Sequence, residues 1–186
     1  MTRHRFPVSP LAAGALALAA AALLTQPAPA RAADAVSGHA SLNAQAITLA
    51  HGFGFWNPAR RNVELGLFAA PPAAADVKAA LADGIESAFG VTSPAKGAYV
   101  LLKLGFPEGA TRADHLNVCE IDFFDFADSP MQTMWLGAEQ CGVVELGGDL
   151  RPGGVVHGRL KGPRETPTGK TYTWDLTFTT TLLARK

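Results

Sequence analysis

The residues best suited to metal binding or acid–base chemistry are four histidines dispersed over residues 33–186: His39, His51, His115 and His157. A zinc site needs several converging ligands, and its histidines usually stand close together, as in H-x-H or H-x-x-x-H. None of these four has a second histidine within four positions. His39 and His51 fall on the two arms of an expected hairpin, so they are the candidate metal ligands, together with a carboxylate. The alternative is ordinary polar histidines at strand edges or bonded to backbone.

A second candidate group is the acidic run Glu120, Asp122, Asp125 and Asp128. Calcium is bound by many oxygen ligands, and the EF-hand loop supplies them from fixed positions around a central glycine. Here phenylalanines interrupt the run and no glycine lies within it. We therefore expect Glu120 and Asp122 to line the solvent-exposed face of a strand, and Asp125 and Asp128 to lie in a turn. A weak calcium site at that turn is the alternative.

No motif for nucleophilic catalysis or nucleotide binding is present. The sequence contains no G-x-S-x-G elbow and no G-x-G-x-x-G or phosphate-binding loop between a strand and a helix. We accordingly assign no catalytic residue, no cofactor-binding residue and no cofactor. A hydrolase site assembled from dispersed histidines and acids is kept as an alternative, because the members of a catalytic triad need not be neighbours in the sequence.

The cysteine content favours a structural disulfide. Residues 33–186 contain two cysteines, Cys119 and Cys141, too far apart for a C-x-x-C redox motif. An exported protein with two cysteines most simply pairs them. A free pair in a reducing compartment is the alternative.

Residues 1–32 are typical of a secretory signal peptide. Its features are a positive start (Arg3, Arg5), an apolar run (11–24) and an A-x-A cleavage site at 30–32, with 28–30 as the alternative site. The apolar run is short for a membrane span. No cysteine lies near the cleavage site and His4 separates the two arginines, so neither a lipoprotein nor a twin-arginine signal is indicated. We expect a periplasmic or secreted protein without a membrane span after cleavage.

Alternating apolar and polar residues, punctuated by glycine and proline, predict short β-strands throughout residues 33–186. The clearest is the last, in which Tyr172, Trp174, Leu176 and Phe178 share one face and threonines share the other. Strands are expected at 35–42, 45–55, 62–69, 97–106, 114–124, 132–136, 140–146, 154–161 and 170–183, and a short helix at 73–83. Eight or nine such strands favour one all-β domain, an antiparallel β-sandwich, with a barrel as the related alternative.

Three tryptophans are the candidate aromatic binding residues. Trp174 is expected in the core, because it shares a face with the other apolar residues of its strand. Trp56 and Trp135 lie near expected turns. An exposed indole there would suit stacking on a sugar or peptide, and an indole that covers one end of the core is the alternative.

Two stretches resemble the hairpins of secreted bacterial β-sandwich proteins of uncharacterised function. G-V-V-H-G-R-L-K-G (154–162) followed by T-Y-T-W-D-L-T-F (171–178) resembles their closing hairpin, and S-L-N-A-Q-A-I-T-L-A-H-G-F (41–53) is similar to their first. The resemblance implies an exported sandwich and carries over no functional residue.

Charge excludes the strongly basic classes of protein. Cleavage of the leader leaves 13 basic against 16 acidic residues, a net charge of −3. Such a balance gives no electrostatic footprint for nucleic acid or an anionic membrane. The sequence therefore favours an exported, non-catalytic binding or interaction module for an unknown protein or small ligand. A hydrolase and a metal-binding protein using His39 and His51 are the alternatives.

Overall fold

The sheet is organised around β10 (Thr171–Leu183), the longest strand of the structure. The computed structural model describes residues 34–42, 44–89, 97–126, 129–137, 139–165 and 169–185, without the side chains of Leu42 and of 125–135. The other elements are β1 (Ala35–Leu42), β2 (Gln45–Leu49), β3 (His51–Asn57), β4 (Asn62–Phe68), α1 (Ala74–Asp83), α2 (Ile85–Phe89), β5 (Tyr99–Gly105), β6 (Val118–Phe126), β7 (Ser129–Gly137), a 3-10 turn η1 (Glu139–Cys141), β8 (Val143–Gly148) and β9 (Val155–Glu165).

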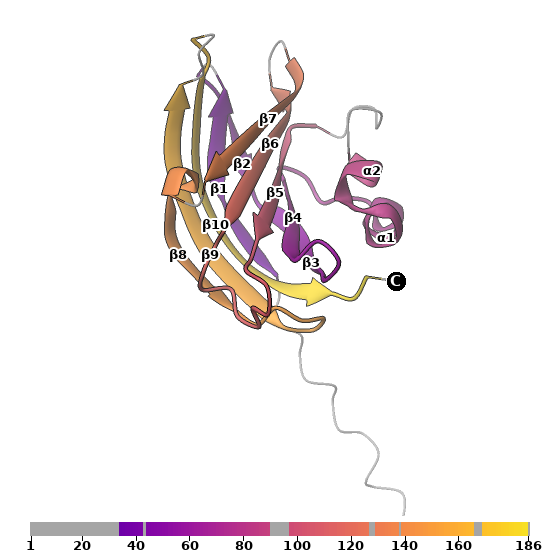
Figure 1. Cartoon of the computed structure of the whole chain (residues 1–186). Helices are drawn as coiled ribbons and strands as arrows, with labels where there is room; N and C mark the ends of the chain where they lie inside the picture. Colours follow the sequence, from indigo (N-terminus) through magenta and orange to yellow (C-terminus); the bar gives the residue numbers. More distant parts are fainter. Residues whose placement is uncertain are drawn as a thin grey trace, which may run out of the picture. The chain divides into compact units, whose positions relative to one another are not determined.

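Ten strands form one continuous, strongly curled sheet, a half-barrel (Figure 1). Its order is β2-β1-β10-β3-β4-β5-β6-β7, and β9 and β8 extend it from the other side of β10. Neighbouring strands pair antiparallel, except where the end of β10, Leu182–Leu183, runs parallel to Gly54–Phe55 of β3. β10 joins the two parts of the sheet because it is long enough to pair with β1 and β9 first and with β3 at its end. The chain is mostly β and its strands pair mainly antiparallel, as predicted, and the ten strands form a half-barrel.

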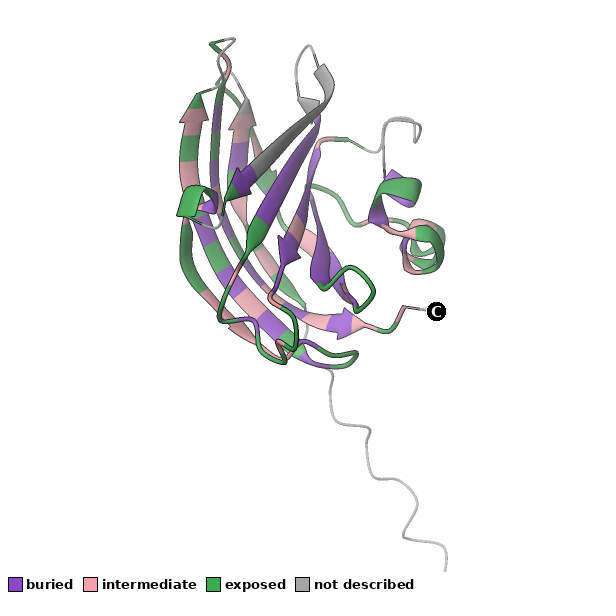
Figure 2. Cartoon of the chain, in the orientation of Figure 1, coloured by how far each residue is buried: buried purple, intermediate pink, exposed green. Residues whose placement is uncertain are grey.

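The inner face of the curled sheet encloses the main core. On β10 the burial alternates, and the side chains of Tyr172, Trp174, Leu176 and Phe178 are buried as predicted. They pack with apolar residues from β4, β5, β6 and β9. Figure 2 shows the same alternation along the strands on this side, with exposed residues between buried ones.

A second apolar layer lies on the outer face of β3 to β6, under α1 and α2 (Figures 1 and 2). Phe68 stacks with Phe53 and contacts Phe89 of α2, with ring centroids 5.9 Å and 4.9 Å apart. Ala80 of α1 and Ile85 of α2 are fully buried in this layer. Every residue of β4 is therefore buried, because the strand is covered on both faces.

The predicted helix at 73–83 is confirmed as α1, and the second helix was missed. Gly84 ends α1 with a φ of 99° and donates its N–H to Ala80 O at 2.9 Å. α2 begins at the next residue. Phe89 ends α2, and residues 90–96 lie outside the described part of the chain. The two helices differ in burial, since α1 exposes most of its residues and α2 buries Ile85, Ala88 and Phe89.

Glycines of β9 make room for the aromatic rings of β10. Gly162 lies opposite Trp174 and Gly158 opposite Phe178. A Cβ added at Gly162 would lie 2.6 Å from the Trp174 ring. Because that ring is buried in the core, it has little freedom to move aside.

We expect Gly162→Ala to lower the free energy of unfolding by about 1–3 kcal/mol, the usual effect of overpacking. Urea unfolding followed by circular dichroism measures it. The matched control is Gly137→Ala, where an added Cβ meets nothing within 4 Å and the change is expected to stay within about 0.5 kcal/mol. Equal effects of the two substitutions would contradict the steric argument.

Candidate functional site

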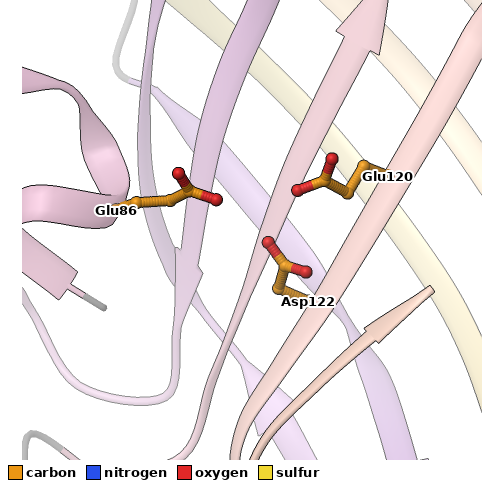
Figure 3. Close-up of side chains that lie close together, drawn as sticks. All are labelled: Glu86, Glu120 and Asp122. Atoms are coloured by element: carbon orange, nitrogen blue, oxygen red, sulfur yellow. The ribbon is translucent and has the colours of Figure 1, made fainter. Parts of the chain in front are cut away.

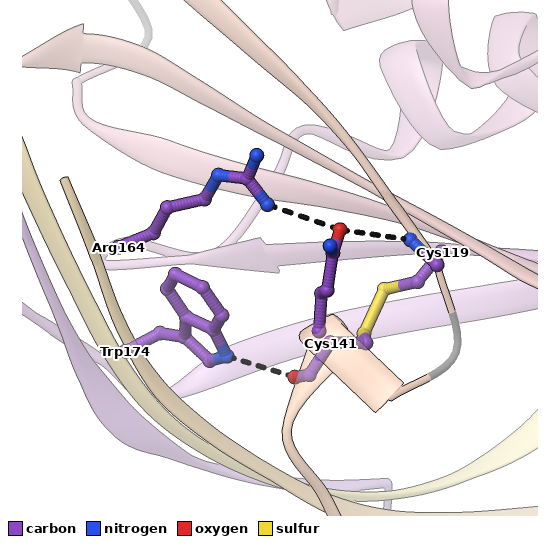
Figure 4. The surroundings of a disulfide bond; sticks show 6 residues. Cys119, Cys141, Arg164 and Trp174 are labelled. Atoms are coloured by element: carbon purple, nitrogen blue, oxygen red, sulfur yellow. Dashed lines mark hydrogen bonds between the residues drawn. A yellow bond between two sulfur atoms is a disulfide. The ribbon is translucent and has the colours of Figure 1, made fainter. Parts of the chain in front are cut away.

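The predicted disulfide is confirmed. Cys119 of β6 and Cys141 of η1 are bonded, with Cα atoms 5.9 Å apart, and both residues are fully buried. Figure 4 shows the surroundings: the Trp174 indole N–H donates to Cys141 O at 3.2 Å. Gln140 Oε1 accepts from Arg164 at 3.1 Å. The bond and these contacts fix η1, and therefore the place where β8 begins.

The structure separates the histidines into different surroundings. His39 is exposed on β1, and its Nδ1 lies 3.3 Å from Thr48 Oγ1. His51 begins β3, His115 is exposed before β6, and His157 Nε2 on β9 lies 3.5 Å from Glu145. Among the described residues, the one group of three potential metal ligands contains no histidine. The structure does not bring His39 and His51 into a shared group of this kind.

The predicted surroundings of the acidic run were partly wrong. Glu120 and Asp122 are buried, 3% and 0% exposed, instead of lining a solvated face. The physical reason is that this face of β6 meets α2, whose Glu86 lies beside both carboxylates. Asp125 and Asp128 lie outside the described side chains. Glu120, Asp122 and Glu86 of α2 each offer a carboxylate oxygen, all within 4.8 Å of one another (Figure 3).

Lys103 of β5 neutralises part of this carboxylate group. It lies opposite Glu120 in the sheet register and donates to the carboxylates of Glu120 and Glu86. Burial alone would lower the pKa of Lys103, but hydrogen bonds and charge from Glu120 and Glu86 outweigh it and raise the pKa above 10.5. Lys103 therefore stays charged, and its contribution to stability is present below pH 10.5 and is lost as the pH rises through the raised pKa.

Glu64 of β4 extends the row of charged groups and ties α2 to the sheet. It lies opposite Lys103 and is 2% exposed. Its Oε1 accepts from Asn57 Nδ2 at 3.0 Å, and its Oε2 accepts from the Ile85 N–H, the first of α2, at 3.3 Å. Hydrogen bonds to an ionised acceptor are the strong ones, so this contact fixes the beginning of α2.

The main role open to the carboxylates of Glu86, Glu120 and Asp122 is structural. Glu86, Glu120 and Asp122 could each give an oxygen to a hard cation. However, the Lys103 ammonium already provides two of the three carboxylates with the positive charge that a metal ion would bring. We interpret the group as a buried ion-pair network that holds α2 against β5 and β6.

Asp175, on the exposed side of β10, is also held by cations. Arg159 donates to its two oxygens at 3.0 Å and 2.9 Å, and Lys161 Nζ lies 3.5 Å away. The Arg159 hydrogen bonds lower the pKa of Asp175. A shallow hollow of about 290 Å³ adjoins this pair and is bounded by Gly162, Pro163 and Thr173, among others. The charged side chains of Asp175 and Lys161, which line this hollow, are already paired.

Two larger hollows carry groups that are less fully paired. One, of about 400 Å³, lies between residues 114–116 and β8. Its lining includes the exposed Val143 and Val144 and three carboxylates. The other, of about 520 Å³, lies at the β3–β4 turn and is lined by Trp56 and two arginines. Trp135, the other candidate aromatic, has no described side chain, and Trp174 is buried as expected.

Comparison with known protein families, curated proteins and solved structures finds no match. The function is therefore argued from this chain's own geometry. In the described part of the chain, no helix combines the length and the apolar character needed to cross a membrane.

Proposed function

We propose that the chain is an exported, non-catalytic interaction module that binds an extended segment of a partner protein along β8. The observation that carries the proposal is a free strand edge with exposed valines beside a hollow ringed by carboxylates. An extended peptide adds to such an edge through main-chain hydrogen bonds, and side-chain pockets select it. The experiment is a titration with synthetic peptides of opposite charge.

The edge of β8 is open over most of its length. Within the described residues, β8 pairs only with β9. Its end is closed, because Ala113 N donates to Gly148 O at 2.9 Å and Arg112 forms an isolated bridge with Asp149. At the beginning of β8, η1 is fixed by the disulfide. The unpaired edge between these two closures faces the hollow at residues 114–116.

Apolar exposure at this edge indicates a partner. Val143 is 38% and Val144 is 61% exposed. Natural proteins usually protect a free edge with charge, proline or a bulge. Here the pairing with β9 shifts between Val143 and Glu145, which is a bulge, yet the two valines are still exposed.

Charge selects the kind of partner. The hollow is lined by Asp114, Glu139 and Glu145, and no lysine or arginine lines it among the described residues. Electrostatic complementarity favours a partner segment that carries basic residues. Alternation of side chains along a strand then predicts a segment in which basic and apolar residues alternate.

Export is part of the proposal. It is supported by the signal-like residues 1–32, which lie outside the described part of the chain, and by the buried disulfide, because such bonds persist in oxidising compartments. The expected sandwich and the observed half-barrel share one property, a main apolar core enclosed on the inner face of the sheet. Because Lys103 already pairs with Glu86 and Glu120, the proposal gives this buried acidic group a structural role.

A peptide of alternating lysine and valine is expected to bind at β8, and one of alternating glutamate and valine is not. Amide chemical shifts in ¹⁵N-labelled protein should move at Val143–Gly147. Val144→Lys should weaken binding at least about tenfold, because it puts a positive charge against a basic segment. The matched control is Val155→Lys, since Val155 is 40% exposed on β9 and does not line the hollow. Equal binding of the two peptides would refute the proposal.

A further inference from the structure

We propose that the hollow at the β3–β4 turn is a second binding site, for a small planar anion such as an aromatic carboxylate. The hollow has a volume of about 520 Å³, within the range of small-molecule sites. Trp56, Pro58 and Arg60 line it from the turn, Pro152 lines it from the β8–β9 connection, and Arg185 from the residues after β10. This site is separate from the β8 edge and does not depend on it.

The three segments that form the hollow are held in place by hydrogen bonds. Asn57, 2% exposed, accepts the Arg60 N–H on its Oδ1 at 3.3 Å and donates to Glu64. Gly153 N donates to Leu182 O at 2.7 Å, and Leu182 N donates to Gly154 O at 2.8 Å. The walls of the hollow are therefore formed before a ligand enters, which reduces the entropy cost of binding.

The apolar wall suits a flat ring. Trp56 is half-buried, and its ring lies beside Phe106 with centroids 6.2 Å apart. Pro58 and Pro152 complete the apolar lining. Aromatic groups bury much surface against such a wall and prefer offset or edge contacts with an indole. A neutral aromatic molecule would satisfy this wall but leave the arginines without a partner.

The two arginines of the hollow favour a negatively charged ligand. Among the described residues, neither Arg60 nor Arg185 forms an ion pair with a carboxylate, whereas the neighbouring Arg61 pairs with Glu108 at 3.3 Å. The guanidinium carbon of Arg185 lies 5.9 Å from the centre of the Phe55 ring, a cation–π distance that keeps it near the hollow. A guanidinium binds a carboxylate through two parallel hydrogen bonds. Two unpaired arginines beside a tryptophan therefore point to an anion with a ring.

The test is a titration of the ¹⁵N-labelled protein with 2-naphthoate, followed at the indole N–H signals of its three tryptophans. Trp56→Phe identifies the signal of Trp56. We expect that signal to move in a saturable way with 2-naphthoate, and at least about tenfold less readily with the neutral 2-naphthamide. Arg60→Gln should weaken naphthoate binding by at least about tenfold, and Arg60→Gln with Arg185→Gln should abolish it.

The control is Arg164→Gln, which changes a half-buried arginine that hydrogen-bonds Gln140 beside the disulfide and should leave naphthoate binding unchanged. Circular dichroism of each variant shows that the fold is kept. Equal affinity for naphthoate and naphthamide, no shift of the Trp56 signal, or unchanged binding in the double arginine variant would each overturn the proposal. Binding of the lysine–valine peptide at β8 is independent of all three outcomes.

Discussion

Lys103→Met is expected to lower the free energy of unfolding by about 3–5 kcal/mol at pH 8, the usual effect of removing one partner from a buried ion pair. The Lys103 side chain is 12% and that of Glu120 4% exposed, and Asp122 is fully buried. Without the ammonium, the Glu120 and Glu86 carboxylates lose the cation that they share. Urea unfolding at pH 8 measures the loss.

The pH dependence distinguishes lost charge from lost packing. In the Lys103→Met variant, protonation of a carboxyl removes the repulsion, so the deficit should shrink as the pH falls from 8 to 5. A pure packing defect would stay constant over that range. The wild-type contribution of Lys103 should vary little there, because its pKa is raised above 10.5 and it stays protonated.

Two further variants complete this experiment. Lys78→Met removes an exposed lysine from α1 and should change stability by less than about 0.5 kcal/mol. Lys103→Met with Glu120→Gln removes one charge of each sign and should recover part of the loss, because a neutral amide is cheaper to bury than an unpaired carboxylate. If the single and double variants are equally unstable at every pH, the ion-pair interpretation is wrong.

Much of the fold could be predicted from residue periodicity. The alternation from Tyr172 to Phe178 predicts a strand with one buried face, and the structure confirms it. The Cys119–Cys141 bond followed from cysteine count and expected export. The curl of the sheet could not be predicted, because it depends on β10 pairing first with β1 and then with β3. A single strand's residue pattern carries no information about a change of partner along its length.

The buried acidic group was missed for a related reason. Alternation on β6 correctly separates Cys119 and Ile121 from Glu120 and Asp122, but it does not say whether the second face meets water. Here that face meets α2, which sequence reasoning did not identify as a helix. One signal was available: the apolar run of β5 leaves few polar positions, as expected of a strand covered on both faces. Lys103 is the exception within that run, and it forms the centre of the network.

Removal of the disulfide has the second large expected effect. Cys119→Ala with Cys141→Ala should lower the free energy of unfolding by roughly 3 kcal/mol, because the bond closes a loop with a sequence separation of 22 and restricts the unfolded chain. Reduction of the wild-type protein with dithiothreitol should cause a similar loss, and the double variant should not respond to dithiothreitol. A variant that responds as strongly as the wild type would contradict this interpretation.

The state of the Cys119–Cys141 disulfide also provides a test of export. Protein made with residues 1–32 and recovered from the periplasm, then unfolded without reductant, should show no free thiol on labelling. Two labelled thiols would show that the bond does not form in that compartment. Because Cys141 belongs to η1, immediately before β8, loss of the bond should also loosen the beginning of the strand edge. The double alanine variant should therefore bind the lysine–valine peptide more weakly than the wild type, while naphthoate binding at Trp56 stays unchanged.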